Sequence, residues 1–472
     1  MIPRTLLSLA QACAGELRSA SPSHEVHRVT TDSREMRSGD LFVALRGERF
    51  DAHDFLGAVA KVPGVAAVVS RARFLQVPIG LPCIVVDDPR QAYARMAAAY
   101  RLEFEIPIVC VGGSNGKTTT KELIAAVVGS DRSILKSEAS FNNDVGVPAT
   151  LFRLEAFHRA AVLEAGTNHP GELSPLVRMI APSVGIITSI GREHLEFFRD
   201  LDGVVREEGA LAEQLPSANK GGVLILEGAT PWSEALSKKT EARVVRIGYA
   251  PSNDWMVTLV SMGWSGTRFI VRAPRPDWSG EYFVNLPGRH SVLNALYALT
   301  VACELGVEPT AARDGLAAFQ PASRRLQVYS IDGVQVLDDT YNANADSMLA
   351  ALRTLADLPI EGRRVAVLGD MAELGPETPS AHMEVGKAVK ELGIDQLLAV
   401  GRYASITVKA TGRANDLAFD DAETVSRHLI KTLKPGDGLL VKASRSSRLE
   451  QVVEILLERA KIYAVSSDKV AH

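Results

Sequence analysis

One short segment carries the strongest chemical signal in the sequence, the glycine-containing stretch from Gly113 to Thr120. It follows an apolar run that ends at Val111, and it leads into a helical pattern that continues from Lys121. A turn of this kind between a strand and a helix directs several backbone N–H groups and the positive end of the helix dipole at an anion. Lys117 adds a full positive charge, and the hydroxyl of Thr118 can ligate Mg²⁺. The segment therefore predicts a phosphate-binding loop.

This loop is shorter than the common P-loop, which carries a glycine five residues before its last glycine. Val111 stands at that position, so we expect the phosphate-binding residues to be Gly113, Ser114, Asn115, Gly116, Lys117, Thr118 and Thr119. The alternative is an ordinary glycine turn before a helix. We prefer the phosphate loop because Lys-Thr after the last glycine, between a strand pattern and a helix pattern, rarely arises by chance.

Two further polar residues follow apolar runs that are typical of parallel strands. Glu164 closes the run that begins at Ala160, and His194 follows the run Val184–Ile190. Because open α/β sheets bind ligands at the carboxyl ends of their strands, we expect both side chains to face the phosphate loop. Together with Thr118 they would supply ligands for magnesium. The alternatives are a solvated loop carboxylate and a structural histidine.

The elements that must position these residues belong to a long chain of ordinary composition. A length of 472 residues predicts about three domains. The apolar fraction of 46%, the charged fraction of 23% and the net charge of -4 indicate a soluble globular protein and give no bulk basicity that would suggest nucleic acid. Any anionic ligand must therefore be bound by local basic sites.

The cysteines and the first residues bear on the compartment. Cys13, Cys83, Cys110 and Cys303 are scattered and form no metal-binding pattern, which indicates reduced thiols in a cytosolic protein. The stretch from Thr5 to Ala14 could be a weak signal peptide, but we prefer an amphipathic helix because a glutamine interrupts its short apolar core. No apolar run reaches membrane-spanning length. We expect a cytoplasmic protein without a membrane span.

The pattern of strands and helices divides the chain into three α/β units. Residues 1–105 hold short strand candidates and an alanine-rich helix, and Pro107 marks the boundary. In residues 106–319, apolar strand runs alternate with helical patterns, which predicts a mostly parallel sheet, with extra β-structure over Trp255–Asn285. Residues 320–472 repeat the alternation and predict a second doubly wound, Rossmann-like α/β domain.

Six motifs spread along the chain resemble those of the Mur ligases. They are Gly113-Ser-Asn-Gly-Lys-Thr-Thr-Thr120, Asn142-Asn-Asp-Val-Gly-Val-Pro148, Glu164-Ala-Gly-Thr-Asn-His-Pro-Gly-Glu172, His194-Leu-Glu196, Gly288-Arg-His-Ser-Val-Leu-Asn294 and Asp338-Asp-Thr-Tyr-Asn-Ala-Asn344. The last motif, together with Val367-Leu-Gly-Asp-Met-Ala-Glu-Leu-Gly375, is similar to the type that adds D-alanyl-D-alanine. The resemblance covers essentially the whole chain.

The resemblance implies an ATP-dependent amide ligase that uses Mg²⁺ in the synthesis of a peptidoglycan precursor. The middle domain would phosphorylate the terminal carboxylate of UDP-N-acetylmuramoyl-tripeptide, and the amine of D-alanyl-D-alanine would then attack the acyl phosphate. Lys117 and the magnesium ligands Thr118, Glu164 and His194 would offset the repulsion between carboxylate and phosphate. We expect no nucleic-acid partner and a monomer.

The resemblance also implies binding residues in all three domains. The N-terminal domain would bind the uridine nucleotide, with Ser33, Arg34, Arg46 and His53 as candidates. Asn294, Arg325 and Asp339 match positions that hold ATP. The C-terminal domain would bind the incoming dipeptide. Candidates for binding the two peptide substrates are Asn143, Tyr341, Asn342, Asn344, Lys442, Ser444 and Arg445. The asparagine side chains could instead cap a turn, and Arg325 and Arg445 could be solvated surface residues.

One position departs from the family pattern. Most Mur ligases carry a lysine on the helix after the histidine strand, and CO₂ converts that lysine to a carbamate that helps to hold the second Mg²⁺. The matching position in this sequence is Glu208, whose carboxylate needs no CO₂ chemistry. We therefore expect Glu208 to act as a metal ligand in catalysis. Glu207 competes for the role if the alignment shifts by one residue, and a solvated helix residue is the remaining alternative.

Other functions remain open at this stage. Within the same enzyme class are the ligase that adds lysine or diaminopimelate and a ligase similar to folylpolyglutamate synthase. The absence of an Asp-Asn-Pro-Arg signature disfavours the diaminopimelate-adding enzyme, and the nucleotide-type N-terminal block disfavours the folate enzyme. From a different class comes a P-loop ATPase that acts as a switch without ligation.

Overall fold

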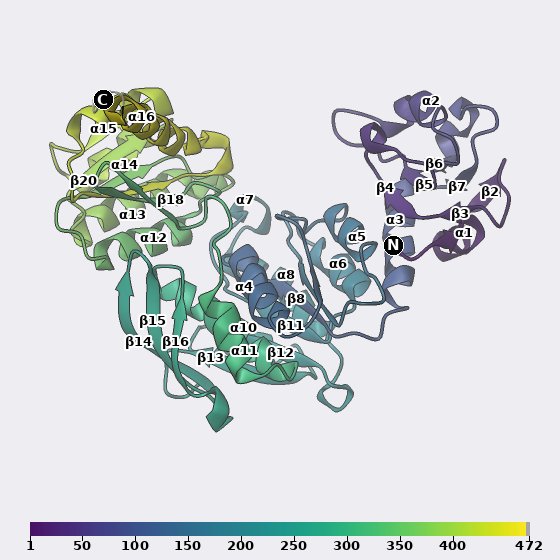
Figure 1. The fold of residues 1–472 in the computed structure, drawn as a ribbon, viewed down its shortest axis with the longest axis horizontal. Coiled ribbons are helices and arrows are strands. Elements are labelled where there is room, and N and C mark those ends of the chain that lie inside the picture. Colours follow the sequence, from purple (N-terminus) through teal and green to yellow (C-terminus); the bar gives the residue numbers. More distant parts are fainter. Residues whose placement is uncertain (469–472) are drawn as a thin grey trace.

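The computed structural model describes residues 1–468, and in this range three large β-sheets follow one another along the chain, beside a two-stranded one (Figure 1). The three sheets carry helices on their faces, which confirms the predicted α/β class. Figure 1 shows the first sheet set apart from the other two, with the middle sheet between the N-terminal and C-terminal parts. The division at residues 105/106 and 319/320 stays a prediction, and the last four residues of the third predicted domain lie outside the described residues.

The first sheet has five strands in the order β2-β7-β6-β5-β4. All neighbours are parallel except β2, which pairs antiparallel with β7. The strands are β2 (Glu16–Arg18), β4 (Arg28–Thr30), β5 (Asp40–Val43), β6 (Ala66–Ser70) and β7 (Cys83–Val86). A separate antiparallel pair joins β1 (Arg4–Thr5) and β3 (Glu25–Val26). The helices are α1 (Leu6–Cys13), α2 (Leu56–Val59) and α3 (Pro89–Arg101), and α1 confirms the helix expected near the N-terminus.

Helix α3 attaches the first sheet to the middle one. It begins after Asp88, whose side chain accepts hydrogen bonds from the first turn, and it has proline at its start, where no N–H is needed. The helix also packs on the middle part of the chain. The Tyr93 and Phe152 rings stack with centroids 5.7 Å apart, and the Tyr100 hydroxyl donates to the carbonyl of Leu154 at 2.7 Å. One buried apolar cluster therefore runs across this junction.

The middle sheet has nine strands in the order β16-β15-β14-β13-β12-β11-β8-β10-β9. Its strands are β8 (Ile108–Gly112), β9 (Ile134–Lys136), β10 (Ala160–Glu164), β11 (Val184–Ile187), β12 (Val223–Glu227), β13 (Arg243–Gly248), β14 (Trp255–Gly263), β15 (Gly266–Arg272) and β16 (Gly280–Val284). In the sheet order from β9 to β14, which includes β8, each strand is parallel to the next, whereas β14, β15 and β16 pair antiparallel. The expected extra β-structure is thus confirmed.

Helices cover both faces of this middle sheet, as a parallel sheet requires. They are α4 (Lys117–Gly129), α5 (Gly146–Leu151), α6 (Leu173–Ile180), α7 (Leu195–Phe198), α8 (Leu201–Glu213), α9 (Ser233–Ser237), α10 (Arg289–Glu304) and α11 (Pro309–Ala317). Strand β8 is buried along its whole length between β11 and β10, and its residues Ile108–Val111 are apolar on both faces. The phosphate loop therefore leaves the sheet from a central strand.

The third sheet has six strands in the order β17-β18-β22-β19-β20-β21, and all pairs are parallel except β17 with β18. The strands are β17 (Gln327–Ile331), β18 (Val334–Asp339), β19 (Arg364–Leu368), β20 (Gln396–Val400), β21 (Leu417–Phe419) and β22 (Gly438–Lys442). The helices are α12 (Ala345–Asp357), α13 (Thr378–Glu391), α14 (Ala404–Thr411), α15 (Ala422–Thr432) and α16 (Glu450–Asp468). Among the residues described, no helix is long and apolar enough to cross a membrane.

Candidate active site

The predicted phosphate loop joins strand β8 to helix α4. Gly113 and Gly116 have φ angles of 103° and 88°, in the left-handed region that favours glycine. A Cβ atom on Gly113 would lie 2.5 Å from the Thr188 hydroxyl, and one on Gly116 would lie 2.8 Å from Asn294 Oδ1. Both glycines are therefore required by conformation and by space, and they bring the loop backbone close to the next strand end and to helix α10.

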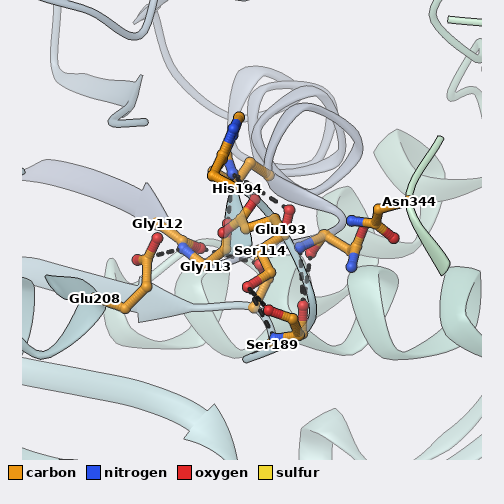
Figure 2. A network of polar contacts seen from close by, with 12 residues as sticks. Gly112, Gly113, Ser114, Ser189, Glu193, His194, Glu208 and Asn344 are labelled. Atoms are coloured by element: carbon orange, nitrogen blue, oxygen red, sulfur yellow. Dashed lines mark hydrogen bonds and ion pairs between the residues drawn. The ribbon is translucent and has the colours of Figure 1, made fainter. Parts of the chain in front are cut away.

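The segment that follows strand β11 fixes the shape of the loop. The Ser114 N–H donates to the Ser189 carbonyl at 2.8 Å, and the Asn115 N–H donates to the Ser189 hydroxyl at 2.9 Å. In return, the Gly191 N–H donates to the Ser114 hydroxyl at 2.9 Å (Figure 2). The loop is thus held in place before any ligand binds, which lowers the entropic cost of binding a phosphate.

Lys117 lies at the start of α4 with its ammonium group over the loop. Its Nζ donates to the Gly113 carbonyl at 2.6 Å and lies 3.5 Å from Glu193 Oε2. Burial alone would lower the pKa of Lys117, but the carboxylates of Glu193, Glu208 and Glu164 outweigh it and raise the pKa above its ordinary value. The lysine therefore keeps its positive charge where a phosphate would be bound.

Thr118 and Glu164 meet next to Lys117, as the strand-end argument predicts. The Thr118 hydroxyl donates to Glu164 Oε2 at 2.9 Å, and Asn142 Nδ2 donates to Glu164 Oε1 at 2.9 Å. These are hard oxygen donors beside a phosphate loop, so the residues fit a magnesium ion. In the described part of the chain, no three His, Cys, Asp or Glu side chains converge tightly enough to hold a metal alone. Magnesium commonly completes its shell with phosphate and water, so two protein oxygens suffice.

His194 lies at the start of α7 in the left-handed conformation, with φ of 48°. Its Nδ1 is 2.8 Å from Glu373 Oε2, a residue of the third sheet's domain. His194 also lines the same cavity as Lys117 and Glu164. Strand β11 ends at Ile187, before the expected Ile190, so His194 lies at the end of the segment between β11 and α7, where it contacts the C-terminal part of the chain.

Glu208 lies behind the phosphate loop, on helix α8. Its side chain is 1% exposed, and its Oε2 accepts the Gly113 N–H at 2.6 Å (Figure 2). The other oxygen, Oε1, is buried and has no hydrogen-bond partner in the described structure. Burial raises the pKa of Glu208 to about 8. Glu208 is thus not a solvated helix residue, and its predicted role as a metal ligand stays a prediction, since the described residues lining the cavity do not include it.

Glu207, the alternative to Glu208, has structural hydrogen-bond partners. Its carboxylate accepts the N–H groups of Gly171 at 2.7 Å and of Leu173 at 2.8 Å. These bonds fix the loop before α6 and satisfy the first turn of that helix. The geometry therefore favours Glu208 over Glu207 as the residue that faces the phosphate loop.

The predicted ATP residues outside the loop come from helix α10, from the segment before β17 and from the end of β18. Asn294 on α10 packs against Gly116 and accepts from the Thr120 hydroxyl at 3.3 Å. Arg325 donates from Nη2 to the Thr118 hydroxyl at 3.1 Å. Asp339, at the end of β18, pairs with the Lys442 ammonium at 2.5 Å. Arg325 thus contacts the start of α4 from the C-terminal part of the chain, and Asp339 lines the same cavity.

The predicted substrate residues of the C-terminal domain gather around the ring of Tyr341, and we call this group the polar wall. Tyr341 lies with the Arg325 guanidinium 4.0 Å and the Arg445 guanidinium 5.5 Å from its ring centroid. Its hydroxyl is 2.5 Å from the Ser140 hydroxyl of the middle domain. Both guanidinium groups thus contact the ring, and they present positive charge to an anionic ligand. Arg445 is nevertheless exposed, so the alternative of a surface arginine remains open for it.

The remaining candidates of this wall have structural partners as well. Lys442 is 2% exposed and also donates to the Asn342 carbonyl at 2.9 Å, and Ser444 lies 3.1 Å from the Ser446 hydroxyl. Asn344 caps helix α12 by accepting the Ser347 N–H at 2.9 Å. The alternative that Asn344 is a cap is therefore correct for its Oδ1 atom. Its Nδ2 donates to Asn115 Oδ1 at 2.9 Å, so the same side chain also touches the phosphate loop.

These groups share one cavity of about 1200 Å³ between the middle and C-terminal domains. It is lined by most of the predicted site residues: Ser114, Asn115, Gly116, Lys117, Thr118, Thr119, Asn143, Glu164, His194, Asn294, Arg325, Asp339, Tyr341, Asn342, Asn344, Lys442, Ser444 and Arg445. The volume and the mixture of positive and negative groups suit a nucleotide together with a second polar substrate.

The four uridine candidates lie in the first domain and do not line this cavity in the described structure. Ser33 and Arg34 belong to a short turn capped by Asp32, which pairs with Arg34 at 2.5 Å. Arg46 lies in a bridge to Asp51 at the mouth of a loop. Their roles stay predictions.

His53 has an environment unlike that of a free ligand-binding side chain. It is 6% exposed, its Nδ1 is 2.6 Å from Asp51 Oδ1, and its Nε2 accepts the Ser70 N–H at 2.9 Å. Both ring nitrogens are therefore occupied within the domain, which is typical of a structural histidine. A direct contact between His53 and a substrate stays a prediction.

Sequence reasoning missed several residues of the site. Glu193 is 8% exposed beside Lys117, and Asn142 holds Glu164. Lys121, 0% exposed, donates to the Ser137 and Ala139 carbonyls at 2.9 and 2.6 Å and so fixes the loop that carries Asn142. Glu193 directly precedes His194, which was the one signal that could have identified it. The lysine gives no comparable signal because nothing local indicates its burial.

Comparisons with known proteins agree with this geometry. The profile of the Mur ligase middle domain matches residues 111–302, that of the Mur ligase glutamate ligase domain matches residues 324–445, and that of the Mur ligase family catalytic domain matches residues 25–101. The three matches fall on the middle, third and first sheets in turn.

Relatives match over nearly the whole chain. The UDP-N-acetylmuramoyl-tripeptide–D-alanyl-D-alanine ligase of Escherichia coli (strain K12) is 37% identical over 462 residues, which are 97% of this chain and 99% of that protein. The ligase of the same name from Bacillus subtilis (strain 168) is 32% identical and covers 97% of this chain and 99% of its own length.

Solved structures show the same fold. A crystal structure of MurF from Acinetobacter baumannii superposes with a TM-score of 0.87 at 31% identity, covering 97% of this chain and 99% of that one. MurF ligase from Thermotoga maritima, in complex with ADP, superposes with a TM-score of 0.82 at 25% identity, covering 93% of this chain and 99% of that one. The resemblance inferred from the motifs is confirmed, and the chain belongs to the Mur ligase family.

Proposed function

We propose that this chain is an ATP-dependent amide ligase that joins D-alanyl-D-alanine to UDP-N-acetylmuramoyl-tripeptide in peptidoglycan precursor synthesis. One observation carries the proposal. The phosphate loop and the polar wall around Tyr341 face the same cavity from two different domains, so a nucleotide and an incoming amine can meet there. The names of the relatives that match over nearly the full length support the same activity.

The phosphate loop, from Gly113 to Thr119, would hold the ATP phosphates with its N–H groups, and Asn294, Arg325 and Asp339 would hold the rest of the nucleotide. Thr118 and Glu164, with His194 and Glu208 as further ligands, would hold Mg²⁺, which offsets charge on the phosphates when bound. Lys117 would stabilise the charge that develops as the phosphoryl group moves.

The reaction has two steps. An oxygen of the tripeptide carboxylate attacks the γ-phosphorus of ATP, and ADP leaves, which gives an acyl phosphate. The amine nitrogen of D-alanyl-D-alanine then attacks the acyl carbon, loses a proton, and expels phosphate. Lys117 and the arginines beside Tyr341 keep these anions together in a site from which water must be excluded.

We further propose a division of substrates among domains. Residues 1–105 would bind the uridine nucleotide through Ser33, Arg34, Arg46 and His53. Residues 106–319 would bind ATP, together with Arg325 and Asp339 of the third domain. Residues 320–472 would bind the dipeptide through the wall around Tyr341, with Asn143 contributing from the middle domain. The chain would act as a cytoplasmic monomer, which light scattering after size exclusion and cell fractionation would test.

The deciding experiment measures phosphate release with UDP-N-acetylmuramoyl-tripeptide and a panel of amines. Release that requires both the tripeptide and D-alanyl-D-alanine supports the proposal. Release with lysine or diaminopimelate, on an acceptor one residue shorter, would favour the preceding ligase of the pathway. Release without carboxylate or amine would indicate an ATPase switch.

A further inference from the structure

The segment Ser189–His194 lies between the phosphate loop and the C-terminal domain and contacts both. Ser189 and Gly191 hold the loop backbone. Among the next three residues, Arg192 and His194 contact the C-terminal domain, whereas Glu193 between them contacts Lys117. Neighbouring residues of one short segment thus touch the phosphate-binding lysine and the domain that closes over it.

Arg192 makes the densest contact of this segment. Its backbone N–H donates to Asp346 Oδ2 at 2.7 Å, and its Nε and Nη2 donate to Asp346 Oδ1 at 3.1 and 2.7 Å. Nη2 also donates to Glu384 Oε1 at 3.2 Å, and Nη1 donates to the other oxygen of Glu384. Asp346 lies in the first turn of helix α12 and Glu384 lies on α13, so one guanidinium fastens two helices of the C-terminal domain to the middle domain.

The residues around the Arg192–Asp346 contact allow the middle and C-terminal domains to approach closely. A Cβ atom on Gly191 would lie 2.7 Å from Asp346 Oδ2, so only a residue without a side chain leaves room for that carboxylate at this distance. Next to it, Asn344 caps the same helix α12 and reaches Asn115 of the phosphate loop. The start of α12 is therefore held against the loop at two adjacent points.

We infer that Arg192 is a positioning residue for ligation, which fixes the C-terminal domain over the phosphate loop through Asp346 and Glu384. The inference rests on the proposed function and deepens it. The acyl phosphate survives only where water is excluded, and the dipeptide has to reach it from the C-terminal wall. Among the described residues that line the cavity, Arg192 is not included, so it would act by holding the closed arrangement.

The contact is partly exposed, with the Arg192, Asp346 and Glu384 side chains at 29%, 36% and 44% exposure, so each single ion pair contributes little. A guanidinium that engages two carboxylates in a forked geometry contributes more than either pair alone. We expect Arg192→Ala to lower the closed population and to raise the KM for D-alanyl-D-alanine roughly five- to thirtyfold. Nucleotide affinity should fall less, because the phosphate loop stays in place and only Arg325 and Asp339 of the proposed nucleotide residues come from the C-terminal domain.

The test compares the full-length wild type with Arg192→Ala, Arg192→Lys, Glu384→Gln and the double variant Arg192→Ala/Glu384→Gln. Small-angle X-ray scattering with a non-hydrolysable ATP analogue and the tripeptide substrate measures closure. Phosphate released per amide formed measures water access to the acyl phosphate. The control is Trp264→Phe, because Trp264 Nε1 donates across the same two domains to the Pro359 carbonyl at 3.0 Å, on the β14–β15 hairpin away from the segment.

The inference expects Arg192→Ala to release excess phosphate per amide and to scatter as a more open particle, while Trp264→Phe stays within about twofold of the wild type. The double variant should release no more excess phosphate than Arg192→Ala, because both changes remove the same contact between Arg192 and Glu384. An Arg192→Ala enzyme that matches Trp264→Phe, or additive effects of the two single changes, would overturn it. If Arg192→Ala does not fold, Glu384→Gln and Arg192→Lys carry the same comparison.

The failure of this inference differs from the failure of the proposed function. A wild-type protein that forms no amide from these substrates contradicts the proposed function. The scattering comparison with the ATP analogue then still tests whether Arg192 holds the two domains together.

Discussion

Replacement of Glu208 separates the structural role that its hydrogen bond shows from the metal role that is proposed for it. One role is structural, because Glu208 Oε2 accepts the Gly113 N–H at 2.6 Å and so holds the phosphate loop. The other is the proposed metal role, for which the unpartnered Oε1 is the available atom. Glutamine keeps a hydrogen-bond acceptor but no charge, whereas alanine keeps neither.

The magnitudes follow from the surroundings of Glu208. A hydrogen bond between a backbone N–H and a carboxylate contributes about 1.5–3 kcal/mol, and its loss leaves the buried Gly113 N–H without a partner. With the void left by the side chain, we expect Glu208→Ala to lose about 3–5 kcal/mol of stability. For a domain of about 200 residues this lowers the apparent melting temperature by roughly 10 °C. Glu208→Gln should lose little of it.

Catalysis should distinguish the variants further. A displaced phosphate loop in Glu208→Ala should reduce kcat/KM on the order of a hundredfold. Glu208→Gln should approach the wild type at saturating Mg²⁺ but fall behind it as Mg²⁺ becomes limiting, because an amide cannot lose a proton to become the anionic oxygen ligand that Mg²⁺ prefers. Removal of dissolved CO₂ should leave the wild type unaffected, and any activity regained in Glu208→Lys should require CO₂.

The assay is differential scanning fluorimetry together with phosphate release across a Mg²⁺ titration, with and without CO₂. Full activity and stability in Glu208→Ala would refute both roles. A Glu208→Gln variant that equals the wild type at every Mg²⁺ concentration would leave the structural role alone and remove Glu208 from the metal site.

Lys117→Ala and Glu164→Gln should each reduce ligation on the order of 10²–10³-fold. Calorimetry should still detect normal binding of the uridine substrate, because the N-terminal candidates lie outside the cavity that Lys117 and Glu164 line. Near-normal turnover of Glu164→Gln at limiting Mg²⁺ would exclude Glu164 from the metal site. Asn344→Ala should cost about 1 kcal/mol through loss of the α12 cap. If the same variant leaves the KM for D-alanyl-D-alanine unchanged, Asn344 is only a cap. Burial raises the pKa of Asp51, but hydrogen bonds from His53 and Arg73 outweigh it and lower that pKa to about 2, below the ordinary value of about 4. The stability that Asp51 contributes is therefore present above pH 4 and lost as the pH falls towards 2, so urea titrations of the wild type and Asp51→Asn should converge over that range.

Local patterns in the sequence were sufficient to predict the phosphate loop and the class of fold. The apolar run before Gly113 and the helical pattern after Thr118 each depend on residues close in sequence, so the strand, the turn and the helix could be read without the tertiary structure. The strand-end rule also brought Glu164 next to Thr118, because parallel strands end at one edge of a sheet.

The contacts between distant segments could not be read in this way. Nothing near Glu208 in the sequence indicates that its carboxylate meets Gly113, and nothing near Arg192 indicates that it meets Glu384. These contacts depend on how helix α8 packs on its sheet and on how two domains dock. Such packing is decided by many weak interactions across the whole interface rather than by any local pattern.

His53 is a case in which the sequence does not show which partners the side chain takes. Its residue type and its place in a family motif predict a substrate contact, but its burial and both of its hydrogen bonds are set by Asp51 and Ser70. The sequence alone determined which residues can bind phosphate, metal and substrate. Only the tertiary structure decided which of them remain available, because a buried polar atom takes the partner that its packing provides.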